Sequence, residues 1–263
     1  MKDDLGNRMK EQYENRTRYF LPRRTYSIIR VDGKAFHTLT RGCAKPFDRT
    51  LMTAMQQTAV RLCREIQGAR FAYTQSDEIS ILMCDFDKIT TSAWFDGNLQ
   101  KIVSISSAVA TAEFNKNWDC LGQGKSALFD ARVFTIPDAV EVENYFIWRQ
   151  QDATRNSIEM AARALYSHKE LHKKNGKVLQ DMMHRKGVNW NDYQVDEKRG
   201  SCVVKTQELV DGAPRNRWVV DMPPVFTQDR NYLRSRIPGF PVATTAGLPV
   251  EVKPSLYEVG DVS

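Results

Sequence analysis

Periodic hydrophobic positions predict a strand and a long helix near the start of the chain. Residues 25–31 are rich in β-branched and aromatic side chains and stop at Asp32-Gly33, which predicts a strand that ends in a turn. Apolar residues then recur at steps of three and four, which predicts a helix between an N-cap at Asp48 and a stop at Gly68. The apolar positions of this helix are Leu51, Met55, Ala59, Leu62 and Ile66.

A hairpin follows this helix. Residues 70–75 and 79–84 have the composition of two short strands, and only Ser76, Asp77 and Glu78 separate them. So short a connection predicts a hairpin. Its tip is acidic, which is unusual for the centre of a fold.

A second helix and a fourth strand complete an alternating unit. Residues 99–114 predict a helix with small residues on one side, and residues 127–136 predict a strand that ends at Pro137. The order βαββαβ predicts an α+β fold in which two helices cover one face of a four-stranded antiparallel sheet. This is the ferredoxin-like arrangement, which also forms the palm of nucleic-acid polymerases and nucleotidyl cyclases. Fold alone does not assign a function.

The second half of the chain predicts a helical and hairpin extension. Residues 140–166 have the pattern of one or two helices, and a basic stretch over residues 167–187 follows, with Gly176 as a break. Residues 202–205 and 218–221 predict a late hairpin joined through Asp211-Gly212.

Prolines accumulate near the end of the chain, where six of the ten lie beyond residue 222. We therefore expect the last forty residues to be irregular and partly mobile. The predicted organisation is a palm-like catalytic domain over residues 1–137, a helical, basic extension with a hairpin over 138–222, and a proline-rich tail over 223–263.

Composition limits the class of protein. With 263 residues, of which 41% are hydrophobic, the chain can bury one sizeable core and an extension. No apolar run approaches the ~20 residues that span a bilayer, and the first residues lack the apolar stretch of a secretory signal. We expect a soluble, cytoplasmic protein. Five scattered cysteines without a C-x-x-C pair predict reduced thiols rather than a disulfide framework or a zinc site.

Positive charge is concentrated in one segment. The chain carries a formal charge of +6, and residues 149–187 contain nine basic and four acidic residues. Such a segment is equally well explained as a solvated helix face or as a surface that binds the phosphate backbone of a nucleic acid.

Two carboxylates are expected to converge at one edge of the sheet. In a βαββαβ sheet the first and third strands are neighbours, so Asp32 and Asp77 should meet although they are 45 positions apart. Two adjacent carboxylates repel each other unless a cation lies between them, and a hard divalent ion suits oxygen ligands. A pair of such ions about 4 Å apart supports phosphoryl transfer. Gly33 lets its carbonyl approach the same metal, whereas Glu78 should point to the opposite face of its strand.

Possible triphosphate donors flank these carboxylates. Taken singly, each carboxylate is more simply explained as a turn or loop residue, but Arg30, His37, Lys45 and Ser76 supply the donors that a triphosphate needs. Lys45 precedes a helix start, where amide dipoles also favour phosphate. Lys101 is a weaker candidate, because it is more simply explained as a surface lysine whose stem lies along the protein.

Five segments of the chain resemble the successive motifs of the tRNA-His guanylyltransferase superfamily. The similarity runs in order from about residue 6 to residue 204, which is more specific than any single motif. The segments are Arg30-Val-Asp-Gly-Lys-Ala-Phe-His37, Ala44-Lys-Pro-Phe-Asp48, Tyr73-Thr-Gln-Ser-Asp-Glu-Ile-Ser80, Phe129-Asp-Ala-Arg-Val133 and Trp148-Arg-Gln-Gln-Asp152.

The resemblance implies a polymerase-like palm that adds nucleotides in the 3′-to-5′ direction to the 5′ end of tRNA. It implies Mg²⁺, with two ions, as cofactor, ATP and GTP or other nucleoside triphosphates as substrates, and a homotetramer. The implied metal ligands are Asp32, the Gly33 carbonyl and Asp77. The implied triphosphate contacts are Arg30, His37, Lys45, Ser76 and Lys101, with Ala44 and Asp48 near the base of the activating nucleotide.

One departure from the family pattern bears on the substrate. Where the enzymes specific for tRNA-His have His-Ile-Asn-Asn, this chain has Thr154-Arg155-Asn156-Ser157, and only Asn156 matches. The chain therefore looks like the guanylyltransferase-like branch of bacteria and archaea, which repairs shortened tRNAs by template-directed addition through an adenylylated 5′ end. The implied tRNA surface comprises Arg149, Arg155, Asn156, Lys169, Lys173, Lys174, Lys177, Arg185 and Lys186.

Three alternatives stay open at this point. The chain could be a tRNA-His guanylyltransferase proper. It could be a nucleotidyl cyclase or a 5′-to-3′ polymerase that uses the same palm carboxylates. It could also be a non-catalytic RNA-binding module.

Overall fold

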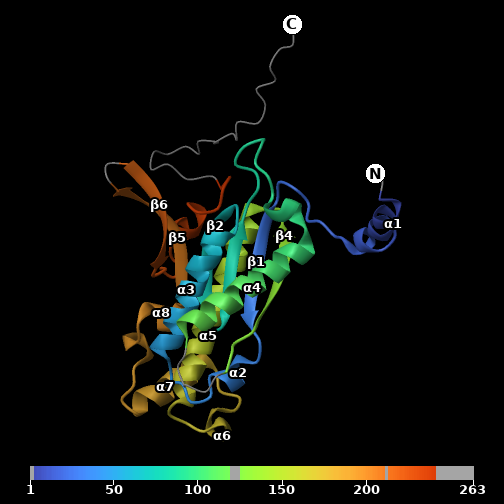
Figure 1. Ribbon diagram of the computed structural model, residues 1–263. Coiled ribbons are helices and arrows are strands. Elements are labelled where there is room, and N and C mark those ends of the chain that lie inside the picture. The colour runs from blue at the N-terminus through green and yellow to red at the C-terminus, as the bar shows by residue number, and fades with distance from the viewer. Residues whose placement is uncertain (1–2, 119–124, 211–212, 241–263) are drawn as a thin grey trace, which may run out of the picture.

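A mixed sheet-and-helix architecture is present in the computed structural model, which describes residues 3–118, 125–210 and 213–240. Within these ranges six strands form one antiparallel sheet in the order β4-β1-β3-β2-β5-β6, and helices cover both of its faces (Figure 1). The strands are β1 (Tyr26–Gly33), β2 (Ala69–Gln75), β3 (Glu78–Met83), β4 (Phe129–Ile136), β5 (Ser201–Val210) and β6 (Ala213–Asp221).

The first half of the chain has the predicted order of elements. Helix α3 (Arg49–Glu65) begins at Asp48, whose carboxylate accepts a hydrogen bond from the Leu51 N–H at 3.0 Å, as expected of an N-cap. Helix α4 (Leu99–Asn117) follows the hairpin β2–β3. Strands β1 and β3 are neighbours, with Ile29 opposite Ile81, so the predicted adjacency of the first and third strands is confirmed.

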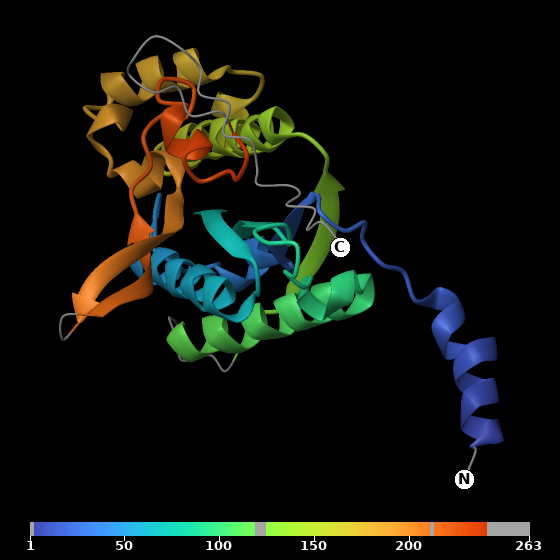
Figure 2. The same ribbon diagram turned by 90° about the horizontal axis from the view of Figure 1, so that it is seen from above.

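Side chains alternate between two cores along the central strands. The first core lies between the sheet and helices α3 and α4, and the second lies between the other face of the sheet and α5 (Ala139–Arg163) (Figure 2). Members of the first core include Ile29, Val31, Leu62, Ile81 and Phe114. Members of the second include Ile28, Phe71, Leu82, Phe146 and Phe226. This alternation assigns every β1 side chain to a face, which decides below what Asp32 and Arg30 can touch.

Residues 139–163 form one continuous helix, α5, rather than two. Gly176, expected as a break, is the first residue of α7, and the Asn175 side chain caps this helix by accepting the Val178 N–H at 3.1 Å. The remaining helices after α5 are α6 (His168–Leu171), α7 (Gly176–Arg185), η3 (Trp190–Asp192), α8 (Val195–Arg199) and α9 (Asn231–Arg234).

The late hairpin is much longer than the sequence pattern indicates. Strands β5 and β6 replace the short predicted strands at 202–205 and 218–221, because their outer halves are polar and exposed and therefore lack a hydrophobic signal. The hairpin extends the central sheet, since Phe71 of β2 lies opposite Val204 of β5. The predicted connection at 211–212 lies outside the described residues.

Residues 223–240 are largely irregular, as expected, but they pack against the second core. Phe226 and Leu233 are fully buried there. The segment is tied to α5 by the buried Glu143 carboxylate, which accepts hydrogen bonds from Arg230 at 3.2 Å and from Arg234 at 2.9 Å. Residues 241–263 of the predicted tail lie outside the described part of the chain.

The amino-terminal segment extends away from the sheet. Helix α1 (Asp4–Gln12) and the short turn η1 (Glu14–Thr17) contain no buried residue, and α1 stands apart from the other elements in both views (Figures 1 and 2).

Two further short elements lie within the first half of the chain, α2 (Phe36–Leu39) and η2 (Trp94–Gly97).

Two expectations from composition can be compared with the fold. Cys63, Cys84 and Cys202 are free, buried thiols, as predicted; Cys120 lies outside the described residues. Over the residues that the structure describes, no helix has both the length and the apolar character needed to cross a membrane.

Candidate active site

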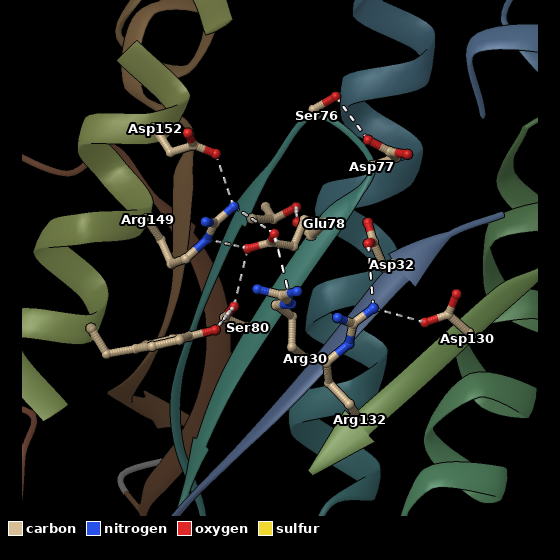
Figure 3. A network of polar contacts seen from close by, with 12 residues as sticks. Arg30, Asp32, Ser76, Asp77, Glu78, Ser80, Asp130, Arg132, Arg149 and Asp152 are labelled. Carbon is tan, nitrogen blue, oxygen red and sulfur yellow. Dashed lines mark hydrogen bonds and ion pairs between the residues drawn. The ribbon is translucent and has the colours of Figure 1, made fainter. Parts of the chain in front are cut away.

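The carboxylates of Asp32 and Asp77 lie within electrostatic reach of each other where β1 ends and the β2–β3 hairpin turns (Figure 3). Asp32 is next to last in β1 and lies opposite Glu78 of β3. Asp77 is the second residue of the two-residue turn, and its backbone oxygen accepts the Gly33 N–H at 3.0 Å. The structure therefore brings together the two carboxylates that the sequence places 45 positions apart.

The turn that presents Asp77 has a constrained backbone. Ser76 has a φ of 51°, in the left-handed region that tight two-residue hairpin turns require. Its hydroxyl donates to Asp77 Oδ1 at 3.0 Å. This hydrogen bond orients the Asp77 carboxylate, so Ser76 has a role in positioning Asp77 that does not depend on a bound ligand.

Electrostatics at this edge favour a bound cation. Burial raises the pKa of the Asp77 carboxyl, the Ser76 hydrogen bond opposes this effect, and the negative charge of Asp32 adds to the increase. Arg132 supplies a counter-charge to Asp32, with a guanidinium nitrogen 3.8 Å from Asp32 Oδ2. A cation between the carboxylates would offset both the cost of burying the charged Asp77 and its repulsion from Asp32.

Gly33 has a steric reason to lack a side chain. A Cβ at this position would lie 2.3 Å from the ring of Phe36. That ring cannot move freely, because it packs against Phe114 and Phe129 with centroid distances of 5.4 and 5.1 Å. The glycine therefore lets the chain turn from Asp32 into α2 without opening the first core.

We expect Gly33→Ala to lower the free energy of unfolding by about 1–3 kcal/mol, because the added methyl group overpacks the Phe36 contact. Chemical denaturation of the purified variant measures this change. Gly176→Ala is the matched control, since a Cβ there would meet nothing closer than Ile158 at 3.8 Å. Equal stability of the two variants would contradict the steric explanation.

Glu78 points away from Asp77, as its position in an extended strand predicts. It is buried, and both of its carboxylate oxygens accept hydrogen bonds from Arg149 of α5, at 2.7 and 2.6 Å. Arg149 is itself only 5% exposed. Its assignment to a tRNA-facing surface is therefore corrected: the partner that buries Arg149 is 71 positions away and cannot be seen in the local charge pattern.

The predicted triphosphate contacts differ in how near they lie to the carboxylates. His37 is exposed, and its charge lowers the pKa of Asp77, so it is within electrostatic reach. Arg30 lies on the same face as Asp32, with its Nε 3.9 Å from Glu78 Oε2 and without a hydrogen-bond partner. Lys45 is exposed in the loop that leads into α3.

The loop before α3 lies at the same end of the sheet as the carboxylates (Figure 1). A small cavity between the first half of α3 and the hairpin tip is lined by Met52, Gln56 and Ser76, among others. Asp48 organises the loop: besides capping α3, it accepts the Ala44 N–H at 2.9 Å. Ala44 and Asp48 are thus held together within this loop.

Lys101 is not brought to this cluster. It lies in the first turn of α4, where Asn98 caps the helix by accepting the Lys101 N–H at 2.9 Å. The backbone of Asn98 also forms an isolated antiparallel β-bridge with Phe20, which lies a few residues before the start of β1. This is the end of the sheet opposite to the one where Asp32 lies.

The donor set fits Mg²⁺ bound together with substrate phosphates. Asp32, Asp77 and the adjacent Gly33 carbonyl supply hard oxygen ligands. Among the residues that the structure describes, no cluster of three or more His, Cys, Asp or Glu could hold an ion by itself. Mg²⁺ commonly uses one or two carboxylates and completes its shell with waters and substrate phosphates.

The basic segment lies beyond the carboxylate edge of the sheet, at the end where α6 and α7 are found (Figure 1). A surface cavity of about 190 Å³ between α5, α6 and α7 is lined by Arg163, His168, His172, Lys173 and Lys174, among others. The exposed members of the predicted tRNA surface are Arg155, Asn156, Lys169, Lys173, Lys174, Lys177, Arg185 and Lys186. Lys186 also donates to the Leu165 carbonyl at 2.7 Å, so it is partly committed to the fold.

Residues 6–137 match the family model for tRNAHis guanylyltransferase. The chain belongs to this family. It is similar to a bacterial tRNA(His) guanylyltransferase-like protein solved with ATP, with 47% identity, a TM-score of 0.81 and coverage of 89% of this chain and 99% of that one. A bacterial guanylyltransferase-like protein solved with GTP has 45% identity and a TM-score of 0.78, with coverage of 90% and 100%.

Two relatives with lower sequence identity are also similar to this chain. An uncharacterised protein of Acanthamoeba polyphaga mimivirus is 27% identical over 88% of this chain and 86% of its own. The tRNA(His) guanylyltransferase of Debaryomyces hansenii is 30% identical over 56% of each, so this chain spans about half the length of that relative.

Several residues at the site were missed by sequence reasoning. Asp130 lies opposite Asp32 in β4, and Arg132 contacts both of these carboxylates. The alternation of polar and apolar residues in the strand predicted at 127–136 could have assigned them to the Asp32 face. Ser80 and Tyr145, whose hydroxyls are 2.8 Å apart, left no comparable signal, because a buried pair of hydroxyls has no sequence pattern.

Proposed function

We propose that the protein is a metal-dependent nucleotidyltransferase that adds nucleotides to the 5′ end of tRNA in the 3′-to-5′ direction, directed by the opposite strand. The observation that carries the proposal is the convergence of Asp32 and Asp77 at the end of β1. Membership of the guanylyltransferase family supports nucleotidyl transfer to tRNA. The similarity to bacterial proteins solved with ATP and with GTP supports nucleoside triphosphates as substrates.

The arrangement of the strands supports a ferredoxin-like, polymerase-type palm over residues 1–137. The order β4-β1-β3-β2, with α3 and α4 packed on one face, is the order that a βαββαβ unit of this type adopts. In this proposal residues 138–222 contribute the tRNA-binding extension, and the tail over 223–263 is attached through the second core.

Positioning and charge neutralisation carry the chemistry, and no protein nucleophile is needed. When bound, two Mg²⁺ ions supply activation of the attacking oxygen and stabilisation of the leaving one. Asp32, Asp77 and the Gly33 carbonyl would hold them. Arg30, His37, Lys45 and Ser76 orient the triphosphate. Lys101 could take part only from a neighbouring subunit, given its place at the far end of the sheet.

Two transfers occur in this scheme. In the first, an oxygen of the 5′ monophosphate of tRNA attacks the α-phosphorus of ATP, and pyrophosphate leaves. In the second, the 3′ hydroxyl of an incoming nucleoside triphosphate attacks the adenylylated 5′ phosphate, and AMP leaves. The carboxylate pair serves both transfers, because each forms and breaks a bond between oxygen and phosphorus.

The basic surface beyond the carboxylates supports tRNA as the polymer that is extended. Its lysines and arginines lie on α5, α6 and α7 and in the segments that join or follow these helices, at the end of the sheet where Asp32 and Asp77 meet. A chain held there would approach the site with its phosphates neutralised. In this proposal the protein is a homotetramer, as the family resemblance implies, and acts in the cytoplasm, as the sequence predicts.

A tRNA-His guanylyltransferase proper is the second candidate, because the family match is equally compatible with it. The segment Thr154-Arg155-Asn156-Ser157 favours the repair activity over this alternative. A cyclase, a 5′-to-3′ polymerase and an RNA-binding module are less well supported by the family match.

One assay separates these candidates. We expect the protein, with Mg²⁺, ATP and each nucleoside triphosphate in turn, to lengthen a tRNA that lacks its first nucleotide, and to add the nucleotide that pairs with the opposite strand. Full-length tRNA-His lacking its extra guanosine is the parallel substrate. Addition to the latter alone would favour the second candidate, whereas growth at the 3′ end or a cyclic product would contradict the proposal.

A further inference from the structure

Arg149 connects helix α5 to the hairpin tip that carries Asp77. Its Nε and Nη2 donate to the two oxygens of Glu78 at 2.7 and 2.6 Å (Figure 3). The same Nη2 donates to Asp152 at 3.1 Å, and the guanidinium lies 4.4 Å from the ring centroid of Trp148. Burial lowers the pKa of Arg149, but the hydrogen bond to Glu78 and the charges of Glu78 and Asp152 outweigh it and raise the pKa, so the guanidinium stays protonated.

So buried an ion pair is poorly explained by stability alone. The side chains of Arg149 and Glu78 are 7% and 9% exposed, and removing two charges from water offsets much of their attraction. Apolar residues of similar size often serve stability as well or better. What the planar guanidinium supplies here is a fixed geometry, because a bidentate pair sets both distance and angle.

That geometry acts directly on the site, since Glu78 follows Asp77 in the chain. Contacts within the sheet hold the tip: Glu78 pairs with Asp32 of β1, the Gly33 N–H donates to the Asp77 carbonyl at 3.0 Å, and the Thr74 hydroxyl donates to the Glu78 carbonyl at 3.0 Å. The Glu78 side chain also accepts a hydrogen bond from Ser80 of β3 at 3.3 Å. Among the residues that the structure describes, Arg149 is the partner of the Glu78 side chain that comes from outside strands β1, β2 and β3. Without Arg149, the Glu78 side chain loses its bidentate partner, and the turn that carries Asp77 is less firmly fixed beside Asp32.

We propose that Arg149 is a positioning residue, which fixes the Asp77 carboxylate beside Asp32 by holding Glu78, and that it makes no contact with RNA. Asp152 takes part by orienting the guanidinium, and it is linked in turn to the exposed Arg155, which donates to it at 2.7 Å. This inference rests on the proposed function, because the tip matters for activity only if Asp77 acts in catalysis.

Substitutions that remove one positive charge distinguish a residue that positions the site from a residue that contacts RNA. We expect Arg149→Met to lower the single-turnover rate at saturating tRNA and ATP by about 10–100-fold, as loss of the support behind a metal ligand does. Its dissociation constant for tRNA and the dependence of that constant on salt should stay as in the wild type. By contrast, Lys173→Met on the exposed basic surface should weaken tRNA binding and reduce the slope of log K against log salt by about 0.7–0.9.

A double variant tests whether Arg149 acts through Glu78. The double variant Glu78→Gln, Arg149→Met should add nucleotides no more slowly than the slower of the two single variants, because both substitutions remove the same Arg149–Glu78 ion pair. It also removes both buried charges, so it stays folded where Arg149→Met alone is unstable. Arg149→Lys should recover part of the rate. Arg61→Met on α3, an exposed arginine paired with Glu65 at 3.0 Å, is the control with wild-type behaviour.

A structural readout distinguishes failure of this inference from failure of the proposed function. We expect the Gly33 amide, which donates to Asp77, to exchange its hydrogen faster in Arg149→Met than in the wild type, whether or not the protein extends tRNA. Unchanged exchange, additive losses in the double variant, or a lower salt slope for Arg149→Met would each overturn the positioning role. If the wild type adds no nucleotide but exchange of the Gly33 amide changes as expected in Arg149→Met, the proposed function is wrong and the positioning of the hairpin tip by Arg149 is still supported.

Discussion

Asp77→Asn should lower the rate of nucleotide addition on the order of 10³-fold while tRNA binding is kept. The substitution preserves the size of the side chain and its hydrogen bond with Ser76 but removes the negative charge that faces Asp32. Because the proposed chemistry depends on charge neutralisation at this edge, the loss should appear in the rate at saturating substrate. Asp32→Asn should behave in the same way.

The measurement is single-turnover extension of a 5′-shortened tRNA, paired with a binding assay on the same RNA. Asp96→Asn is the matched control, because Asp96 lies in η2, at the end of the sheet opposite to Asp32, and its side chain is 80% exposed. A variant at Asp77 that keeps its activity, or one that loses RNA binding together with activity, would count against a catalytic carboxylate pair.

Phe226→Ala should lower the free energy of unfolding by about 3–5 kcal/mol. Phe226 is fully buried although it lies in the proline-rich segment. Its ring contacts Tyr73 of β2 at a centroid distance of 5.8 Å, and its N–H donates to the Gln150 side chain at 2.8 Å. Truncation leaves a cavity between β2 and α5 that neither rigid element can close.

Thermal and urea unfolding of Phe226→Ala test the role of this segment. The neighbouring Thr227 is exposed, so Thr227→Ala should change stability by no more than about 0.5 kcal/mol. A small effect of Phe226→Ala would mean that residues 223–240 are attached only loosely.

Elements with a buried, periodic face could be predicted from the sequence. The start of helix α3 was predicted correctly because Asp48 caps it, and its buried face was found because Leu62 and its neighbours repeat at helical spacing; the helix ends at Glu65, before the predicted stop at Gly68. The hairpin β2–β3 was found because Ser76 and Asp77 interrupt two apolar runs. The outer half of β5–β6 escaped prediction, since a strand exposed on both faces has no alternation to detect.

The candidate site could also be predicted from the sequence only in part. Asp32 and Asp77 could be paired because strand adjacency follows from the order βαββαβ. The ion pair between Glu78 and Arg149 could not, because it depends on how α5 packs across the second face of the sheet. A local excess of positive charge gives no sign that one of its arginines points inward.

The attachment of β5 to β2 bears on how the molecule can be dissected. The matched family region ends at residue 137, but the sheet continues beyond it. A fragment cut after Pro137 would lose the strand beside β2 and the cover that α5 gives to Phe71 and Leu82. It would expose a row of unsatisfied amides next to a bare apolar face, the combination that promotes aggregation. Truncated versions for biochemistry should therefore retain β5, β6 and α5.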